Sequence, residues 1–431
     1  MSAIVSLDAF ERFDSRGFPT VAAEAVLESG ARGRALAPAG ASTGRAEAKE
    51  RRDGGARFGG RGVREAATAV RGEIFSVLSG LEATDQPLID AQLLALDGTA
   101  DKSRLGANVV LAVSLAVARA AANESEQPLY RYLGGATARV LPVPMFNLIN
   151  GGAHANNGLD FQEFMILPAG YGSFAEAFEA GAEVYHALRS ALADSGRSVA
   201  LGDEGGFAPD FDDSEQAIEA ILGACETAGV AVGRDVWLGL DCAASGLVTG
   251  EADGAAIYRY GGRDFGGAEW VEHLGGLVGR YPILSLEDPA GESDELTWRE
   301  VTREFGGKLQ LVGDDNLVTS SERVRVAARG GVGNSVLVKP NQVGTLTETL
   351  ETVRVAGEVG FGCVVSHRSG ETEDTTIADL AVGLNVGQIK CGAPARGERT
   401  AKYNRLLDIG DELGVGCLYA GTSAFKTLSI E

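Results

Sequence analysis

Short apolar runs that each finish on a charged residue recur through the second half of this chain, and they restrict its fold more than any other feature. A strand in a parallel sheet reads as a continuous apolar run because both of its faces are covered. When such strands close into a barrel, their carboxyl ends converge on one mouth. The pattern therefore predicts that charged side chains distant in sequence meet in one pocket. The runs are 161–163, 201–204, 238–241, 284–288, 311–315, 336–339, 364–368 and 388–390.

The chain divides near Leu141-Pro142-Val143-Pro144, where prolines mark a boundary. Before it, strand-like alternation precedes helical patterns from about residue 63 to 133, which is typical of a small α+β domain. After it, apolar runs alternate with helical patterns, which indicates βα units. We predict an N-terminal α+β capping domain over residues 1–136 and a modified (β/α)₈ TIM-like barrel over 137–431. A doubly wound open sheet is the alternative, weakened by the absence of a strand-associated G-x-G-x-x-G or P-loop.

The composition of the chain narrows the classes of function. A net charge of −22 over 431 residues argues against nucleic-acid binding, which needs basic patches. No apolar stretch reaches the roughly 20 residues that cross a bilayer, and the N-terminus lacks the basic and apolar regions of a signal peptide. The five cysteines are widely spaced, so neither a disulfide framework nor a zinc site is indicated. We expect a cytoplasmic protein without a membrane span.

Three acids at strand ends form a candidate metal site: Asp241, Glu287 and Asp314. Carboxylate oxygens suit Mg²⁺, and the presence of only four histidines disfavours zinc. The alternative is a buried salt-bridge network with Lys339 and Lys390. Such networks are often no more stable than an apolar core, so we favour the metal site.

Lysine and glutamate residues supply candidates for acid–base catalysis. Lys339 follows an apolar strand, and nearby cations should lower its pKa toward the range of a general base. Glu204 lies among glycines that expose its carboxyl group to a ligand, and Glu163 would raise the pKa of a neighbouring carboxyl group. The structural alternatives are a charge partner for Asp314 in the case of Lys339, and an ordinary loop acid in the case of Glu204.

A second group of residues favours binding of an anion. Arg368 and Ser369, which follow His367 at a strand end, are typical of a phosphate or carboxylate clamp. His154 lies in a polar glycine-rich loop, where a histidine is more often structural than catalytic. Together with the acids and lysines, these residues suggest removal of the proton beside a metal-bound carboxylate. Cations would stabilise the resulting ene-diolate, and a glutamic acid opposite the lysine would support loss of water.

Motifs along nearly the whole chain carry a resemblance to one family. They include Asp14-Ser15-Arg16-Gly17, Gly40-Ala41-Ser42-Thr43-Gly44, Gly202-Asp203-Glu204-Gly205-Gly206-Phe207, Leu337-Val338-Lys339, Asn341-Gln342-Val343-Gly344-Thr345 and Ser366-His367-Arg368-Ser369-Gly370. With these motifs the chain resembles the enolases, or phosphopyruvate hydratases. A lysine or histidine base together with Mg²⁺ is an established property of the enolase superfamily.

The resemblance implies a Mg²⁺-dependent lyase that interconverts 2-phosphoglycerate and phosphoenolpyruvate in glycolysis. It implies Lys339 as base, Glu204 as general acid and Glu163 as its assistant. It implies two Mg²⁺ ions, the first held by the three strand-end acids and the second enclosed with the help of Ser42. It also implies a homodimer or homo-octamer acting on a small anionic phosphorylated substrate. The residues that the resemblance assigns to substrate binding are His154, His367, Arg368, Ser369 and Lys390.

Several positions depart from the family pattern. Phe18 replaces the usual asparagine, and Gly246 replaces a glutamate after Asp241. These departures motivate a second hypothesis, an enolase paralogue that dehydrates a modified 2-phosphoglycerate, such as one forming carboxyphosphonoenolpyruvate in phosphonate biosynthesis. A third hypothesis, of another class, is a non-catalytic binding protein with an enolase fold. Retention of Lys339, Glu204 and the three carboxylates argues against the third, because a scaffold does not need a crowded charged mouth.

Overall fold

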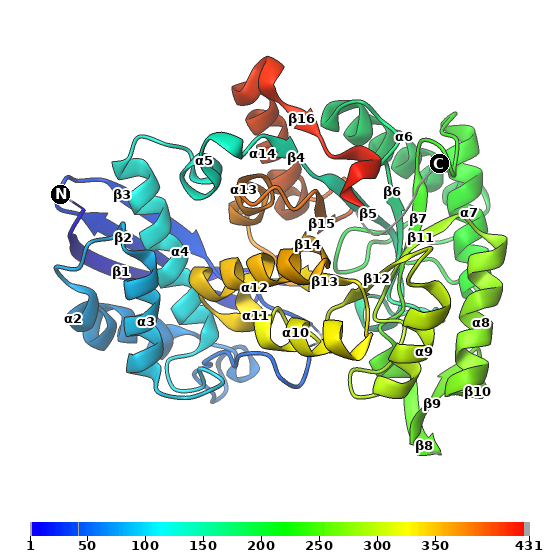
Figure 1. Ribbon diagram of the computed structural model, residues 1–431, viewed down its shortest axis with the longest axis horizontal. Helices are drawn as coiled ribbons and strands as arrows, with labels where there is room; N and C mark the ends of the chain where they lie inside the picture. Colours follow the sequence, from blue (N-terminus) through cyan, green and yellow to red (C-terminus); the bar gives the residue numbers. More distant parts are fainter. Residues whose placement is uncertain (1, 42, 253, 426–431) are drawn as a thin grey trace.

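The computed structural model of the chain describes residues 2–41, 43–252 and 254–425. A smaller N-terminal part and a larger barrel lie side by side along the long axis of the molecule (Figure 1). The N-terminal part opens with three antiparallel strands in the order β1-β2-β3, and helices follow them, as predicted. The strands are β1 (Ile4–Phe13), β2 (Pro19–Leu27) and β3 (Arg32–Leu36).

Helix α4 is buried on nearly all sides, in agreement with its apolar sequence. It lies between strands β2 and β3 and the barrel helices α11 and α12. The helix approaches β3 so closely that a Cβ atom on Gly33 would come 2.1 Å from the carbonyl oxygen of Ala116, which only glycine avoids. The helices of this part are α1 (Arg64–Ala69), α2 (Phe75–Leu78), α3 (Gln86–Asp97), α4 (Ala107–Glu124) and α5 (Leu129–Gly134), with a π-helical turn over Val70–Ile74.

Eight strands close the barrel in the order β11-β12-β13-β14-β15-β5-β6-β7, which rules out the open sheet. Strand β6 runs antiparallel to both of its neighbours, whereas the other adjacent pairs are parallel. The predicted modified barrel is therefore confirmed, and its modification is the reversed β6. The strands are β5 (Val143–Asn150), β6 (Glu163–Leu167), β7 (Trp237–Asp241), β11 (Ile283–Glu287), β12 (Gln310–Gly313), β13 (Ser335–Val338), β14 (Gly362–Ser366) and β15 (Gln388–Gly392).

Helices surround the barrel, and a small three-stranded antiparallel sheet extends from it at the lower right of Figure 1. Its strands are β8 (Val248–Ala252), β9 (Ala255–Tyr260) and β10 (Arg263–Gly266). Strand β4 (Val140–Leu141) pairs with β16 (Leu418–Tyr419). The helices are α6 (Phe174–Asp194), α7 (Ser214–Thr227), α8 (Gly267–Arg280), α9 (Glu295–Phe305), α10 (Ser321–Gly330), α11 (Pro340–Val343), α12 (Leu346–Val359), α13 (Thr376–Gly383) and α14 (Gly397–Leu413).

The inside of the barrel changes from apolar to charged along its axis. One end is filled by an apolar cluster that includes Met145, Met165 and Phe425. In the middle, Gln310 donates hydrogen bonds to Gln388 (2.9 Å) and Ser285 (3.1 Å). Lys390 comes two residues after Gln388 on β15 and so faces the same side of its strand, one layer nearer the mouth. Charge is thereby confined to one end of the barrel.

Contacts between the two parts hold the N-terminal loop against the barrel mouth. Ala39 pairs with Gly370 in an isolated antiparallel bridge, and the guanidinium group of Arg119 forms an ion pair with Asp374 at 3.0 Å. These contacts place residues 39–41, at the start of the glycine-rich loop, beside the segment that follows β14.

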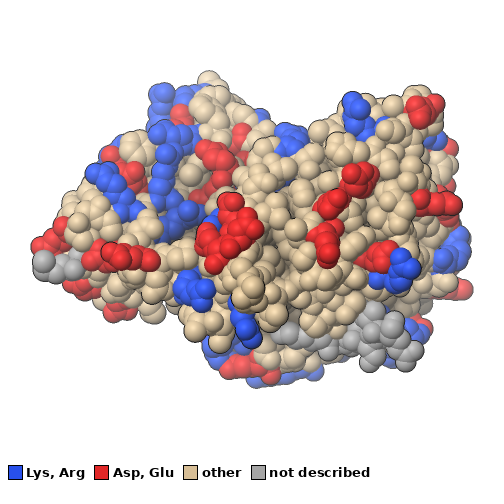
Figure 2. Space-filling view, turned by 90° about the horizontal axis from the view of Figure 1, so that it is seen from above, with Lys and Arg blue, Asp and Glu red and all other residues tan. Residues whose placement is uncertain are grey.

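The surface shown in Figure 2 carries acidic and basic side chains interspersed, with a run of basic side chains over the N-terminal part at the left. On that face, the net negative charge is not gathered into one patch. Among the helices that the structure describes, none combines the length and apolar character needed to cross a membrane.

Candidate active site

Five of the charged residues expected at strand ends lie around one mouth of the barrel. Asp241 and Glu287 are the last residues of β7 and β11, and Asp314 and Lys339 directly follow β12 and β13. Lys390 is the third residue of β15 and lines the same pocket as Asp241 and Lys339. The first four positions agree with the strand-end pattern, whereas Lys390 lies in the middle of its strand. The chemical roles of all five residues stay predictions.

Two further residues, Glu163 and Glu204, do not lie at strand ends as predicted. Glu163 begins strand β6 instead of ending a strand, and it reaches the mouth because β6 runs against its neighbours. Glu204 lies in a loop between α6 and α7, not at the end of a strand. That loop is held to the barrel because the backbone carbonyl of Glu204 accepts a hydrogen bond from Ala393 N at 3.0 Å. Both acids therefore face the pocket, but by routes that the apolar runs did not predict.

Lys390 is the positive centre of the pocket. Its ammonium group lies 2.8 Å from Glu287 Oε2, 3.1 Å from Glu163 Oε1 and 3.3 Å from Asp241 Oδ2. The side chain is almost completely buried. Burial alone would lower the pKa of Lys390, but the surrounding carboxylates outweigh burial and raise that pKa well above its usual value. Lys390 is therefore a fixed positive charge.

Lys339 forms an ion pair with Asp314, whose second oxygen accepts a hydrogen bond from Gln342 Nε2 at 2.8 Å. Burial alone would lower the pKa of Lys339, but the contacting Asp314 carboxylate raises it above its usual value. The predicted lowering of this pKa assumed cations beside the lysine, so it stays a prediction for the metal-bound site. Lys339 can act as a base only when Asp314 no longer compensates its charge.

Glu163 and Glu204 form a buried carboxyl pair in contact with two histidines. His154 Nδ1 lies 3.6 Å from an oxygen of each acid, and His367 Nε2 lies 3.4 Å from Glu204. Burial and then the Glu204 charge raise the pKa of Glu163 well above its usual value. Burial alone would also raise the pKa of Glu204, but the two histidines and Lys390 outweigh it and hold this pKa well below the usual range. A proton held by the pair would therefore lie on Glu163.

Arg399 fixes the protonation of His367. The guanidinium group donates to His367 Nδ1 and to the backbone carbonyls of Arg368 (2.7 Å) and Ser369 (2.6 Å). Since a guanidinium group only donates, Nδ1 must accept, and the imidazole proton lies on Nε2 facing Glu204. Burial lowers the pKa of His367 to about 3, so the ring stays neutral and supports Glu204 by the Nε2–H dipole instead of a full charge.

Arg368 and Ser369 occupy the wall of the pocket next to the glycine-rich loop. Ser369 Oγ accepts a hydrogen bond from the backbone N–H of Ala41 at 3.1 Å. The Arg368 guanidinium group lies 2.8 Å from a carboxylate oxygen of Glu47 in the N-terminal part. Ser42, the expected contributor to a second cation site, lies outside the described residues.

The pocket between these side chains is small and polar. Its volume is about 10 Å³, room for about one water molecule. Three buried atoms facing it have no hydrogen-bond partner among the described residues: His154 Nδ1, Glu163 Oε2 and His367 Nε2. Buried polar groups are rarely left unpaired, so these atoms indicate a site completed by a ligand.

The donor chemistry of the mouth fits a hard divalent cation. Burial and the neighbouring Asp241 carboxylate raise the pKa of Glu287 to about 8, because together they outweigh the lowering by Lys390 and Lys339. Asp241 and Glu287 both form ion pairs with Lys390, whereas Asp314 forms an ion pair with Lys339. Among the described residues, two groups of three have all their ligand atoms within 4.8 Å of one another, and the predicted trio is neither of them. The groups are His154, Glu163 and Glu204, and Asp288, Asp314 and Asp315.

Two polar residues that support the site were not predicted. Gln162 donates to Asp241 Oδ2 at 3.1 Å, and Asn147 donates to Glu204 Oε2 at 3.1 Å. Asn147 is completely buried within the apolar strand β5. A lone amide inside an apolar run was the signal available in the sequence, because a buried amide needs a polar partner.

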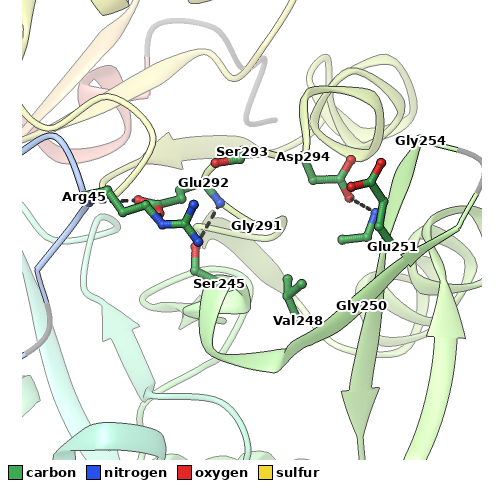
Figure 3. Close-up of a pocket in the computed structure, with 11 residues that line it drawn as sticks. Arg45, Ser245, Val248, Gly250, Glu251, Gly254, Gly291, Glu292, Ser293 and Asp294 are labelled. Carbon is green, nitrogen blue, oxygen red and sulfur yellow. Dashed lines mark hydrogen bonds and ion pairs between the residues drawn. The ribbon is translucent and has the colours of Figure 1, made fainter.

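A larger cavity of about 300 Å³ lies beside the glycine-rich loop (Figure 3). Arg45, directly after the loop, reaches Glu292 with its side chain at 2.7 Å and with its backbone N–H at 3.1 Å. The backbone N–H of Glu292 in turn donates to Ser245 Oγ at 2.8 Å. The loop is thus anchored to barrel loops by Arg45 as well as by Glu47.

A barrel whose mouth gathers acids, lysines and an arginine beside an α+β domain is the architecture of an enolase-type lyase. Comparison with family models gives the same answer. The model described as the enolase N-terminal domain matches residues 4–133. The model described as the enolase C-terminal TIM barrel domain matches residues 138–428. The chain therefore belongs to the enolase family.

Proposed function

We propose that this chain interconverts 2-phosphoglycerate and phosphoenolpyruvate as a Mg²⁺-dependent lyase. One observation carries the proposal. Strands β13 and β6 are four positions apart in the eight-strand order, so Lys339 and Glu163 project from opposite sides of one mouth. Glu163 and the proposed acid Glu204 both lie against His154, so the base faces this pair of acids across the pocket, as elimination of water requires. The domain organisation that we propose is a cap over 1–136 and a catalytic barrel over 137–431.

The residues of the chain divide the reaction among them. Lys339 removes the proton at carbon 2 through Nζ. Glu204 passes a proton to the departing hydroxyl group, and Glu163, whose pKa is raised by burial, is the reservoir that supplies this proton to Glu204. Lys390 compensates the carboxylate of the substrate. Arg368 binds the phosphate, assisted by Ser369.

His154 and His367 line the pocket beside the leaving group, where their unpaired nitrogens face the two acids. Asp241, Glu287 and Asp314 would hold the first Mg²⁺, and Ser42 would help to enclose a second. When bound, the ions supply the positive charge that stabilises the ene-diolate and lowers the pKa of the neighbouring lysine.

Mg²⁺ affinity is expected to increase with pH up to about 8. Glu287, with a pKa of about 8, must lose its proton to bind a cation, so binding releases that proton. Below that pKa, release of one proton makes the apparent Mg²⁺ affinity increase by up to about tenfold per pH unit. Calorimetry of Mg²⁺ binding at pH 6, 7 and 8, in buffers of different ionisation enthalpy, measures both effects. An affinity independent of pH with no proton release would contradict the assignment of Glu287.

The stability of the folded protein without Mg²⁺ should instead decrease as the pH increases. The pKa of Glu287 is raised in the folded chain from 4.5 to about 8, so the folded state binds more protons than the unfolded state in that interval. The contribution of Glu287 to the stability of the folded state is therefore lost as the pH increases from 4.5 to about 8. Bound Mg²⁺ should restore the lost stability. The midpoint of thermal unfolding, measured as a function of pH with and without Mg²⁺, tests both changes.

Formation of the enol product, followed by absorbance with 2-phosphoglycerate and Mg²⁺, tests the proposed reaction. Turnover in the usual enzyme range of about 1–10³ s⁻¹ is expected. Turnover far below this range would favour the paralogue that dehydrates a modified 2-phosphoglycerate. Metal-dependent thermal stabilisation without any turnover would favour the non-catalytic binding protein.

One observation favours the paralogue as the second candidate. A cavity of about 390 Å³ adjoins Asp241 and Asp314, and Gly246 lies in its wall. A Cβ atom at Gly246 would meet nothing within 4 Å, so this wall leaves room for a larger substituent. Phe18 gives no such support. Its ring centroid lies 4.2 Å from Cζ of Arg61, and it does not line the pocket at the barrel mouth.

We further propose a cytoplasmic homodimer or homo-octamer that binds its small anionic substrate and no nucleic acid. The net charge of −22 supports the absence of nucleic-acid binding.

A further inference from the structure

Glu47 is a buried acid of the N-terminal part whose side chain belongs to the barrel mouth. It follows the glycine-rich loop by three residues and is only 5% exposed. Oε2 accepts a hydrogen bond from Arg368 Nη1 at 2.8 Å, and Oε1 accepts one from Arg368 Nη2 at 3.3 Å. A carboxylate held by two guanidinium N–H groups fixes both the plane and the position of the arginine.

One oxygen of the Glu47 carboxylate, Oε1, connects Arg368 to two other parts of the site. Oε1 of Glu47 also accepts from the backbone N–H of Gly44, in the glycine-rich loop, and from Gln342 Nε2, both at 3.1 Å. Gln342 Nε2 in addition donates to Asp314, which pairs with Lys339. Glu47 thus touches the loop, the arginine and the amide beside the lysine–aspartate pair.

The backbone of Arg368 is fixed from the opposite side. Its carbonyl accepts from Arg399 Nη1 at 2.7 Å, while Asn341 Oδ1 accepts from Arg368 Nη1 at 3.1 Å. With the backbone and one guanidinium nitrogen held in this way, Glu47 is the acid that contacts both terminal guanidinium nitrogens among the described residues, and so it influences how the group is presented.

We propose that Glu47 is a positioning residue that orients Arg368 and limits how strongly the site holds a phosphate group. This inference rests on the proposed binding of phosphate by Arg368. Glu47 acts through Arg368 and is not itself in contact with the reacting atoms.

The limiting effect follows from charge. Glu47 already compensates the guanidinium charge before any anion arrives, so a phosphate shares that charge with a carboxylate a few ångströms away. Two anions around one buried cation repel each other more than they would in water, because the local dielectric constant is low. Removing the Glu47 charge should therefore tighten phosphate binding, while loss of the paired hydrogen bonds displaces the arginine and slows catalysis.

The test measures two properties of the full-length protein with Mg²⁺ present. One is the dissociation constant of inorganic phosphate by calorimetry, and the other is kcat for 2-phosphoglycerate. For Glu47→Gln we expect the phosphate constant to fall at least about threefold and kcat to fall at least about tenfold. A merely structural role would weaken both binding and turnover, so opposite movements of the two quantities are the distinguishing result.

Two further variants separate charge, geometry and loop anchoring. Glu47→Asp keeps the charge but shortens the side chain, so kcat should fall while the phosphate constant does not. Glu292→Gln is the matched control, because it also removes one carboxylate that anchors the loop but contacts Arg45, whose side chain is 83% exposed and screened by solvent. Glu292→Gln should leave the phosphate constant within about twofold of the parent value.

Weaker or unchanged phosphate binding in Glu47→Gln would overturn the proposal, as would full kcat in Glu47→Asp or the same changes in Glu292→Gln. If Glu47→Gln does not fold, judged by its thermal midpoint, the aspartate variant and the control still decide. Absence of turnover in the parent protein would count against the proposed function. The phosphate measurement would then still test Glu47 by itself.

Discussion

Replacing Lys339 with alanine is expected to reduce exchange of the carbon-2 proton of 2-phosphoglycerate by about 10³- to 10⁴-fold, the upper part of the range for loss of a general base. Lys339 is the lysine at the end of β13, opposite Glu163, and no other lysine in the described part of the chain lines that side of the pocket. Mg²⁺ binding should be retained, because the substitution frees the Asp314 oxygen that now contacts the ammonium group. Solvent deuterium incorporation, followed by NMR, measures the exchange.

Lys339→Arg is the matched control for this prediction. It keeps a positive charge near Asp314, but a guanidinium group does not lose its proton under these conditions. Both variants should therefore be inactive in exchange. Recovery of exchange in the arginine variant would show that the position supplies charge alone and would remove Lys339 as the base.

Replacing Glu204 with glutamine is expected to slow dehydration by about 10²- to 10⁴-fold, the effect of losing a general acid. Proton exchange at carbon 2 should fall at least tenfold less than dehydration, since exchange needs the base on the other side of the pocket. The imidazole N–H of His367 would then face an amide in place of a carboxylate 3.4 Å away. Product formation and deuterium exchange, measured on the same samples, give the two rates.

Glu163→Gln provides the comparison for Glu204. It removes the member of the pair whose pKa is raised and on which a proton held by the pair would lie. We expect a smaller loss of dehydration than in Glu204→Gln. Equal losses of exchange and dehydration in Glu204→Gln would argue against its role as the acid.

The barrel and much of its mouth were predictable because burial on both faces of a strand leaves a direct trace in sequence. Asp241 and Glu287 end apolar runs, and the structure places them at the ends of β7 and β11. Glu163 ends the run Phe161-Gln162-Glu163 in the sequence, but the direction of its strand is a property of the topology. Nothing in residues 161–167 distinguishes a parallel strand from the reversed β6.

Contacts between distant segments account for what the sequence did not reveal. Glu204 reaches the mouth from a loop, and Glu47 reaches Arg368 across 321 positions of sequence. Arg399 is completely buried in the first turn of helix α14, and its role depends on carbonyl groups that converge only in the fold. The direction of the Lys339 pKa shift was not readable from the sequence, because it depends on which charges lie nearest; in the chain by itself the nearest charge is Asp314, which raises that pKa.

Deuterium incorporation at carbon 2 of 2-phosphoglycerate by the unmodified protein, with Mg²⁺ and again with EDTA, tests the central claim most directly. That claim is that acids and a lysine from separate strands cooperate with magnesium to ionise a weakly acidic C–H bond. Incorporation with Mg²⁺ that disappears with EDTA is the predicted result. No incorporation with Mg²⁺, or equal incorporation in both samples, would contradict it.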